Sequence, residues 1–429
     1  MNNIKRLVIA DDLTGANDTG VHFLSVNEPV TVIANPDSEN ENIGTLDAST
    51  IVVNTNSRFF TPKKAYSEVY ECMQKYLALK PTEIYKKIDS TLRGNIGAEI
   101  DAVMAGSGYK IACVVPAAPR NGRTILDGQC YVNGVPLDQT EIAKDPFTPV
   151  RTANLSMIVS SQTTREVGLL PLDIIRSAES TAKRYLHQLV SSGKEIIIAD
   201  SESIEDLVAV EKLFQRLDEK VLFVGSAGFF HAIGNSDGKM GPFIFDESES
   251  DPVGILLVVG SLMDISIRQA EWFCEKEENC RSRKISTANI LKATAPEVEK
   301  IISELTADLS SKNIGLLRTE KEQISAKANS PIIGKALGSI VSKVVNTAGV
   351  DVLFVTGGDT ALYILNELGV SKLNLKDELF PGIAAAEILV PGKTKPTLFI
   401  SKAGSYGEEN ALESVVDYVL RKNTSGVNK

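Results

Sequence analysis

Short apolar runs rich in β-branched residues alternate with longer stretches of mixed polarity along most of this chain. The runs are typical of buried strands, and the stretches at residues 65–79 and 178–190 have the apolar spacing of helices. In the N-terminal half, strands are predicted at residues 6–10, 30–34, 50–54, 84–87, 111–116, 155–159, 195–199 and 221–224. Strands that alternate with helices indicate an α/β fold with mainly parallel sheets.

A polar stretch, GNSDGKMGPFIFDESESDP at residues 234–252, interrupts this alternation. After it, strands and helices start again at GILLVVGS and continue through DVLFVTGGDTAL to PTLFISKAGSYGEENAL. A chain of 429 residues is also too long for one ordinary core. We therefore predict two α/β domains, at residues 1–245 and 252–429.

Composition and charge narrow the classes of partner. Hydrophobic residues make up 43% of the chain and charged residues 23%, which is ordinary for a globular protein. No apolar run approaches the roughly 20 residues of a membrane helix, and the first run meets Asp11 too soon for a signal peptide. The net charge of −10 argues against nucleic acid. Five scattered cysteines without a C-x-x-C motif are typical of reduced thiols, so we expect a cytoplasmic protein without a membrane partner.

Three predicted strands of the C-terminal half run into turns of small residues. The turns are VGS at 259–261, TGGDT at 356–360 and AGSYG at 403–407. In open parallel sheets, ligands bind beyond the carboxyl ends of the strands, where helix N-termini present free N–H groups. Because glycine lets the backbone approach a phosphate closely, three such turns predict a nucleotide phosphate site.

The common nucleotide motifs are missing from the chain. GKT at residues 392–394 resembles the end of a P-loop, but Glu387 stands where the first glycine of that motif belongs, and Pro391 precedes the second. No G-x-G-x-x-G follows a predicted strand. The three histidines have no metal-ligand spacing, and neither a G-x-S-x-G elbow nor a catalytic cysteine signature is present.

Acidic and basic side chains follow three predicted strands of the N-terminal half, at residues 6–10, 50–54 and 84–87. The residues are Asp11, Asp12, Arg58, Lys87, Asp89 and Arg93. A buried strand would not tolerate two adjacent carboxylates without partners. If the three strands are neighbours, the side chains converge at one edge of a sheet.

Such a mixture suits a small polyol that carries a carboxylate. Arginine or lysine would bind the carboxylate, and aspartates would accept hydroxyl protons. Two structural alternatives stay open: the charges could merely neutralise one another, and Asp89, Ser90 or Thr91 could serve as an ordinary helix cap.

Several motifs together resemble those of the four-carbon acid sugar kinase family. They are ADDLTGANDTG, KKIDSTLRGNIGAEIDA, VGSAG, VVGS with Gln269 downstream, VTGGDTA and SKAGSYG, and they span nearly the whole chain. The family phosphorylates threonate, erythronate or 3-oxo-tetronate with ATP. The resemblance implies an N-terminal domain for the sugar acid, a C-terminal domain for ATP and an active site in the cleft between them. The segment Leu262–Asp264 departs from the pattern because it is bulkier than expected.

Carried over by motif, the resemblance implies contacts for each substrate. The sugar-acid contacts are Asp11, Asp12, Arg58, Lys87, Ile88, Asp89 and Ser90, to which the charge cluster adds Arg93. The ATP contacts are Ser261, Gly357, Gly358, Asp359, Thr360 and Gly404. The ending LFPGIAAAEILV…TLFISKAGSYG looks closer to the threonate and erythronate kinases than to the 3-oxo-tetronate kinases.

The expected reaction is transfer of the γ-phosphoryl group of ATP to the O4 hydroxyl of a four-carbon sugar acid, with D-threonate as the first candidate and D-erythronate as the second, giving the 4-phosphate and ADP. Mg²⁺ would bridge the phosphates. Either Asp12 or Asp89 would orient the hydroxyl or accept its proton, and Asp359 would face the metal or nucleotide or cap a helix. The resemblance also implies a partner dehydrogenase for the 4-phosphorylated acid. A homodimer is compatible with the sequence, which fixes neither the oligomeric state, the substrate stereochemistry nor the number of metal ions.

A dehydrogenase, a lyase and a non-catalytic sensor are the alternatives to a kinase. A dehydrogenase would need a dinucleotide fingerprint, and a lyase a metal or Schiff-base signature, and the sequence has none of these. A non-catalytic sensor that binds a sugar acid between two lobes would explain the basic residues. It would not need three glycine turns in its second lobe.

Overall fold

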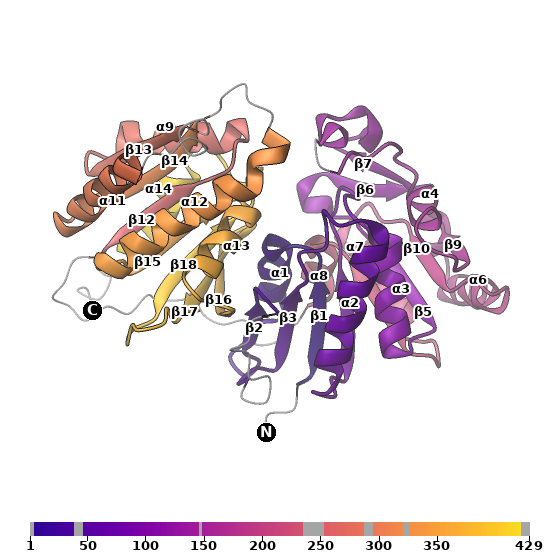
Figure 1. The fold of residues 1–429 in the computed structure, drawn as a ribbon. Coiled ribbons are helices and arrows are strands. Elements are labelled where there is room, and N and C mark those ends of the chain that lie inside the picture. Colours follow the sequence, from indigo (N-terminus) through magenta and orange to yellow (C-terminus); the bar gives the residue numbers. More distant parts are fainter. Residues whose placement is uncertain are drawn as a thin grey trace, which may run out of the picture. The chain divides into compact units, whose positions relative to one another are not determined.

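A computed structural model describes residues 4–37, 46–145, 148–234, 253–286, 295–320 and 326–421 (Figure 1). The chain divides into two compact units. Unit 1 comprises Met1–Val32 and Glu41–Gly238, and unit 2 comprises Ile33–Asn40 and Lys239–Lys429. The predicted domain boundary at residues 245–252 lies outside the described residues.

Unit 1 contains an eight-stranded portion of sheet in the order β2-β3-β1-β4-β11-β5-β10-β9, whose pairs from β3 to β9 are parallel. Its strands are β1 (Arg6–Ala10), β2 (Val30–Ile33), β3 (Thr50–Asn54), β4 (Glu83–Lys87), β5 (Ile111–Val115), β9 (Val167–Leu170), β10 (Ile196–Ala199) and β11 (Val221–Gly225). A separate small sheet is formed by β6 (Arg123–Leu126), β7 (Gln129–Val132) and β8 (Val135–Pro136).

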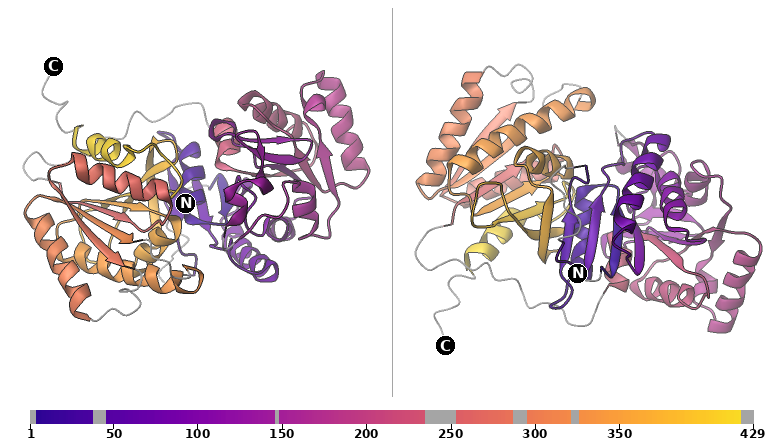
Figure 2. Two further views of the ribbon diagram at one scale, coloured as in Figure 1. Left: turned by 90° about the horizontal axis from the view of Figure 1, so that it is seen from above. Right: turned by 60° about the horizontal axis from the view of Figure 1, so that its bottom comes forward.

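Helices cover both faces of the unit 1 sheet (Figure 2). The helices are α1 (Leu13–Gly20), α2 (Pro62–Leu77), α3 (Ile96–Ser107), α4 (Leu155–Ser160), α5 (Leu172–Ile175), α6 (Glu179–Ser191), α7 (Ile204–Phe214) and α8 (Ala227–Ile233), with 3₁₀ turns at Val21–Phe23, Pro119–Asn121, Leu137–Gln139 and Glu141–Lys144. Helix α3 packs against α2 and α4 in one layer, and α8 packs against α1 and α7 in the other.

The order of the strands determines where unit 1 can bind a ligand. The chain leaves β1 through α1 toward β2 on one side, and leaves the neighbouring β4 through α3 toward β5 on the other. Because crossovers of this kind are right-handed, the two helices lie on opposite faces of the sheet. The crevice between the ends of β1 and β4 is thus a topological switch point, where open α/β sheets bind ligands.

Unit 2 contains seven strands in the order β13-β14-β12-β15-β18-β17-β16. They are β12 (Ile255–Val259), β13 (Cys280–Ser286), β14 (Ile314–Glu320), β15 (Val352–Thr356), β16 (Lys372–Phe380), β17 (Ile383–Ile388) and β18 (Thr397–Lys402). The pairs from β13 to β18 are parallel, and β17 is antiparallel to β16 and β18.

The helices of unit 2 also form two layers. They are α9 (Asp264–Lys276), α11 (Ala295–Ser310), α12 (Ala326–Thr347), α13 (Gly358–Glu367) and α14 (Ala411–Arg421). Helix α12 packs against α11 and α13, and α14 packs against α9. The chain leaves β12 toward β13 and leaves the neighbouring β15 toward β16, so a second switch point lies between β12 and β15.

Apolar residues account for the interior of both sheets. Every residue of β1, β3, β5, β12 and β15 is buried, as expected for strands covered by helices on both faces. In unit 2, β12, β15 and β18 share a continuous core with α9 and α14. No helix among the described residues is long and apolar enough to cross a membrane.

The structure confirms the α/β class, and seven of the eight strands predicted in the N-terminal half are present. The strand predicted at residues 155–159 is wrong, because Leu155–Ser160 is helix α4. Asn154 caps this helix by accepting a hydrogen bond from Met157 N, at 2.8 Å. Leu155 and Val159, four residues apart, are both fully buried while Met157 is exposed, which is a helical pattern.

Candidate functional site

The candidate sugar-acid residues of unit 1 come from three adjacent parallel strands. Ala10, the last residue of β1, pairs with Asn54 of β3 on one side and with Lys87 of β4 on the other. The expectation that these strands are neighbours is therefore confirmed. Their carboxyl ends place Asp11 and Arg58 in contact at the switch point of unit 1.

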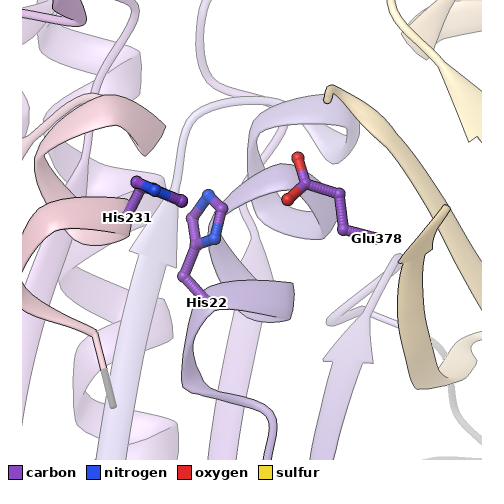
Figure 3. Close-up of side chains that lie close together, drawn as sticks. All are labelled: His22, His231 and Glu378. Carbon is purple, nitrogen blue, oxygen red and sulfur yellow. The ribbon is translucent and has the colours of Figure 1, made fainter. Parts of the chain in front are cut away.

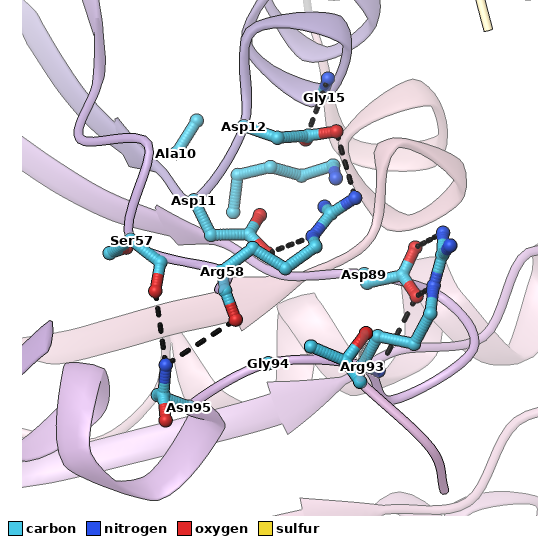
Figure 4. A network of polar contacts seen from close by, with 12 residues as sticks. Ala10, Asp11, Asp12, Gly15, Ser57, Arg58, Asp89, Arg93, Gly94 and Asn95 are labelled. Carbon is cyan, nitrogen blue, oxygen red and sulfur yellow. Dashed lines mark hydrogen bonds and ion pairs between the residues drawn. The ribbon is translucent and has the colours of Figure 1, made fainter. Parts of the chain in front are cut away.

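Arg58 holds both carboxylates that follow β1 (Figure 4). Its Nε donates to Asp11 Oδ2 at 2.7 Å, and its Nη1 donates to Asp12 Oδ2 at 2.8 Å. Asp12 also caps α1, because its Oδ1 accepts a hydrogen bond from Gly15 N at 3.0 Å. Asp11 Oδ1 is buried without a hydrogen-bond partner in the described part of the chain.

The positive charges around Asp11 keep it ionised in spite of its burial. Burial alone would raise the pKa of Asp11, but the charges of Arg58, Lys86 and Lys87 lower it below the ordinary value. Burial alone would lower the pKa of Arg58, but the charges of Asp11 and Asp12 raise it above the ordinary value. Asp11 and Arg58 therefore form a fixed ion pair at neutral pH.

Asp89 and Arg93 form a second pair after β4, shown beside the first in Figure 4. Arg93 donates through Nε to Asp89 Oδ2 at 2.7 Å and through Nη2 to Oδ1 at 3.1 Å, so the pair is bidentate. Thr91 Oγ1 donates to the same carboxylate at 2.5 Å. Burial would raise the pKa of Asp89, but Arg93 and Arg58 hold it well below the ordinary value. Asp89 is therefore a weak base.

Lys87 differs from the other charged residues of the site. Only 5% of its surface is exposed, yet no hydrogen bond or ion pair to its Nζ is formed by any residue that the structure describes. Lys87 Nζ lies beside the backbone of Gly15. A Cβ built on Gly15 would lie 2.6 Å from Lys87 Nζ and 2.5 Å from Asp12 Oδ1. A buried ammonium with unused donors beside carboxylates is a suitable partner for an anionic ligand.

The remaining two residues predicted for this site lie on the same loop. Ile88 is buried, and its backbone N–H donates to Gly225 O of β11 at 2.8 Å. Ser90 is half-buried, and its carbonyl accepts a weak hydrogen bond from Cys130 Sγ at 3.8 Å. For both residues, ligand contact stays a prediction.

A buried ion pair beneath the site was not predicted from the sequence. Lys86 Nζ lies 2.7 Å from Glu99 Oε2, and both side chains are almost fully buried. Glu99 also accepts a hydrogen bond from Ser57 Oγ at 2.8 Å, and Asn95 Nδ2 donates to Ser57 O at 3.0 Å. Two sequence signals could have revealed the pair: Lys86 is a charge inside a buried strand, and Glu99 lies among the apolar positions of α3.

The three glycine turns of unit 2 lie beside one another. Val259, Thr356 and Lys402 are aligned across β12, β15 and β18. A Cβ built on Gly260 would lie 2.2 Å from Thr360 Oγ1, and one on Gly404 would lie 2.2 Å from Ser261 Oγ. The three turns therefore pack against one another at the second switch point.

The predicted ATP residues lie at or beside this switch point. Gly357 adopts φ 104°, a conformation that favours glycine, and α13 begins at Gly358. Thr360 is buried against Gly260, whereas Asp359 is exposed in the first turn of α13. Free N–H groups at the start of α13 and small side chains around it suit a phosphate.

The GKT sequence lies elsewhere in unit 2. It belongs to the hairpin between the antiparallel strands β17 and β18, at the opposite end of β18 from the glycine turns. A P-loop connects a strand to a helix, so the arrangement here does not form one.

Two histidines far apart in the sequence meet in unit 1. The rings of His22 and His231 lie edge to face with centroids 4.8 Å apart (Figure 3). Glu378, also drawn in Figure 3, belongs to unit 2, where it accepts a hydrogen bond from Gly382 N at 3.0 Å.

Two family models together match most of the chain. A protein-family model described as the sugar-binding N-terminal domain matches residues 6–233, and a second described as the nucleotide-binding C-terminal domain matches residues 256–412. The fold is shared with a Haemophilus influenzae protein, at TM-score 0.73 and 22% identity over 96% of this chain and 100% of that chain. It is also shared with a Salmonella typhimurium protein, at TM-score 0.79 and 18% identity over 96% of this chain and 98% of that chain.

Three relatives illustrate the similarity in sequence. The D-threonate kinase of Salmonella typhimurium is 30% identical over 97% of this chain and 98% of its own. The D-erythronate kinase of Heliobacterium modesticaldum is 30% identical over 98% of both chains. The 3-oxo-tetronate kinase of Pseudomonas savastanoi is 27% identical over 95% of this chain and 96% of its own.

The fold, the two sites and these similarities define a two-unit phosphotransferase with an alcohol group as acceptor. The chain belongs to the four-carbon acid sugar kinase family. As a kinase, it uses ATP.

Proposed function

We propose that this protein transfers the γ-phosphoryl group of ATP to the O4 hydroxyl of D-threonate or D-erythronate, giving the 4-phosphate and ADP. The observation that carries the proposal is Lys87, a buried ammonium without a hydrogen-bond partner in the described part of the chain, beside fixed carboxylates. A four-carbon sugar acid supplies what these groups lack: a carboxylate for Lys87 and hydroxyls for the aspartates.

Asp12 is the better candidate for the group that orients the O4 hydroxyl or accepts its proton. Asp89 accepts hydrogen bonds from Thr91 and Arg93 and has a strongly lowered pKa, so it would accept a proton poorly. Asp12 is half-buried, and each of its oxygens has one partner, which leaves lone pairs for a hydroxyl. Asp89 would instead fix Arg93 at the edge of the site.

The glycine turns of unit 2 would bind the phosphates of ATP. Ser261, Gly357, Gly358, Thr360 and Gly404 place small side chains beside the first turn of α13, where N–H groups have no partner within the helix. Asp359 offers an exposed carboxylate of the type that Mg²⁺ prefers, and the ion would neutralise charge on the phosphate oxygens. Transfer in line requires the hydroxyl and the γ-phosphate to meet, so the reaction would require both substrates to be bound at once.

The names of the relatives guide the choice of substrate. The relatives named D-threonate or D-erythronate kinase reach 30% identity, and those named 3-oxo-tetronate kinase reach 27%. A 3-oxo-tetronate is therefore the second candidate. The homodimer and the partner dehydrogenase stay predictions.

The test is ADP release with ATP and Mg²⁺ against D-threonate, D-erythronate, their L-isomers and 3-oxo-tetronates. We expect turnover with one D-acid and little with the others. Turnover with a 3-oxo-tetronate alone would make that acid the substrate in place of the D-acids. ATP binding without turnover of any acid would overturn the proposed substrate class. Lys87→Met, with the exposed Lys212 or Lys220 changed to Met as a control, should raise KM for the acid selectively.

A further inference from the structure

The loop at residues 403–408, which follows β18 in unit 2, is held from behind through its carbonyl groups. Lys402 Nζ donates to Ala403 O and Tyr406 O, both at 2.9 Å. Gln269 Nε2 donates to Tyr406 O, Gly407 O and Glu408 O at 3.1, 3.1 and 2.8 Å. Ser266 Oγ donates to Gly404 O at 2.7 Å.

The side chains of Lys402, Gln269 and Ser266 are all buried, with residue exposures of 1% each. They therefore draw the carbonyls of the loop toward the interior. In a trans peptide the C=O and the following N–H point in opposite directions. The N–H groups that follow these carbonyls consequently point away from the interior.

The loop N–H groups are available to a ligand. None of the residues that the structure describes accepts a hydrogen bond from the N–H of Gly404, Ser405 or Gly407. Gly404 also lies against Ser261 of the neighbouring turn. Successive free N–H groups beside other glycine turns form a concave site for an anion.

We propose that Lys402 is a positioning residue for nucleotide binding: with Gln269, it holds the 403–408 loop so that its N–H groups face the phosphates of ATP. This inference rests on the proposed function of unit 2. Lys402 contacts the loop and not the nucleotide, so its effect on binding is indirect.

Burying the ammonium of Lys402 costs free energy, which favours a functional role for this side chain. The described residues place no carboxylate in an ion pair with Lys402, and only carbonyl oxygens satisfy its ammonium. Burial lowers the pKa of Lys402 to about 8. An apolar side chain of similar length would avoid burying a charge, so the lysine is best explained by the loop conformation that it stabilises.

The test compares Lys402→Met and Gln269→Met with the wild type in the full-length enzyme. We expect each substitution to raise the Kd and KM for ATP at least about 10-fold, because a misplaced loop loses hydrogen bonds to phosphate, with KM for the acid within about twofold. The melting temperature of Lys402→Met should change little, because the loss of a donor for Ala403 O offsets the removal of a buried charge, and Tyr406 O keeps its hydrogen bond from Gln269. Lys393→Met, in the β17–β18 hairpin at the far end of the sheet, is the control and should leave ATP binding unchanged.

Two outcomes would overturn the inference: ATP affinity of Lys402→Met within about twofold of wild type, or equal losses for ATP and acid accompanied by a lower melting temperature. Failure of the proposed function is distinguishable, because wild-type protein would then bind no ATP at all.

A second, independent observation concerns two cysteines of unit 2. Cys274 near the end of α9 and Cys280 at the start of β13 have their sulfur atoms 2.9 Å apart, and both residues are half-buried. A disulfide bond is about 2.05 Å long, so a small side-chain movement would suffice to form one.

We infer that Cys274 and Cys280 form a reversible disulfide by exchange with a low-molecular-weight disulfide. The Cys274 thiolate attacks one sulfur of that disulfide and releases one small thiol; Cys280 then attacks the mixed disulfide, loses its proton and releases the second. The hydrogen bond with Cys280 lowers the pKa of Cys274 to about 7, which identifies it as the attacking thiol.

The test is incubation with oxidised glutathione, followed by alkylation and intact-mass measurement. We expect the oxidised chain to lose about 2 Da and to take up two fewer alkyl groups than the reduced chain, with peptide mapping that links Cys274 to Cys280. The Cys280→Ser variant should stop at a stable glutathione adduct on Cys274. Either an adduct that persists in the wild type or no reaction at all would overturn this second inference.

Discussion

The two units use the same topological position with opposite chemistry. In unit 1, the switch point between β1 and β4 carries charged side chains: Asp11 and Asp12 are held by Arg58, with Lys87 beside them. In unit 2, the switch point between β12 and β15 carries glycines and hydroxyls packed so closely that added methyl groups would clash. Topology fixes where a ligand can bind, and residue type fixes which ligand it is.

The two sites also differ in how they are supported. The charges of unit 1 lie above a second buried ion pair, Lys86 with Glu99. The turns of unit 2 are supported by hydrogen bonds to backbone carbonyls, chiefly from Lys402 and Gln269. Unit 1 should therefore be sensitive to the removal of charge, and unit 2 to the addition of a side-chain carbon.

The largest effect is expected from Asp12→Asn. Asparagine keeps the cap of α1 but cannot accept a proton, so kcat should fall about 10²- to 10⁴-fold with KM for ATP unchanged. Steady-state kinetics at saturating acid and ATP would measure this, with the exposed Asp218→Asn as the control. A variant that keeps more than about a tenth of the wild-type kcat would exclude Asp12 as the base.

Arg58→Ala should have the next largest effect. Removing the guanidinium leaves Asp11 and Asp12 without their partner, so KM for the acid should rise about 100-fold while KM for ATP stays nearly constant. Arg58→Lys keeps one charge and should recover part of the loss, which separates binding from misfolding. Equal increases in both KM values would contradict the assignment of Arg58 to the sugar-acid site.

Matched glycine substitutions sharpen the comparison further. A Cβ on Gly260 would meet Thr360 Oγ1 at 2.2 Å, so Gly260→Ala should weaken ATP binding about 10- to 30-fold and spare the acid. A Cβ on Gly15 would meet Asp12 and Lys87, so Gly15→Ala should weaken binding of the acid and spare ATP binding. Gly349→Ala is the control, because no atom lies within 4 Å of its built Cβ. Calorimetric binding of each substrate to each variant measures the contrast, and a loss of both affinities in either variant would contradict it.

The sequence was sufficient to predict the strands that precede the charged cluster and the glycine turns, because buried strands of a parallel sheet have continuous apolar patterns. The order of the strands was not predictable, since contacts such as Ala10 with Lys87 depend on long-range pairing. The helix at Leu155–Ser160 was mistaken for a strand because a five-residue apolar run is compatible with either period.

The supporting residues were harder to predict than the site itself. Glu99 and Lys86 are 13 positions apart and meet only because α3 packs on β4. Cys274 and Cys280 show no recognised motif, and their proximity depends on the turn between α9 and β13. Side chains brought together by packing leave no local signature in the sequence.

The smallest effect expected is a pH-dependent change in stability at Asp89. Arg93 and Arg58 hold the folded pKa of Asp89 well below its ordinary value despite burial, so its charge stabilises unit 1 fully above about pH 4 and loses this effect as the pH falls through the folded pKa. Asp89→Asn should lower the free energy of unfolding by about 1.5 kcal/mol at pH 7, and the difference from wild type should shrink below about pH 4. Circular dichroism in urea measures it, while fluorescence of Trp272, the single tryptophan and a residue of unit 2, should show no difference between the two proteins. A difference that is constant down to pH 3 would mean that the charge of Asp89 is not its source.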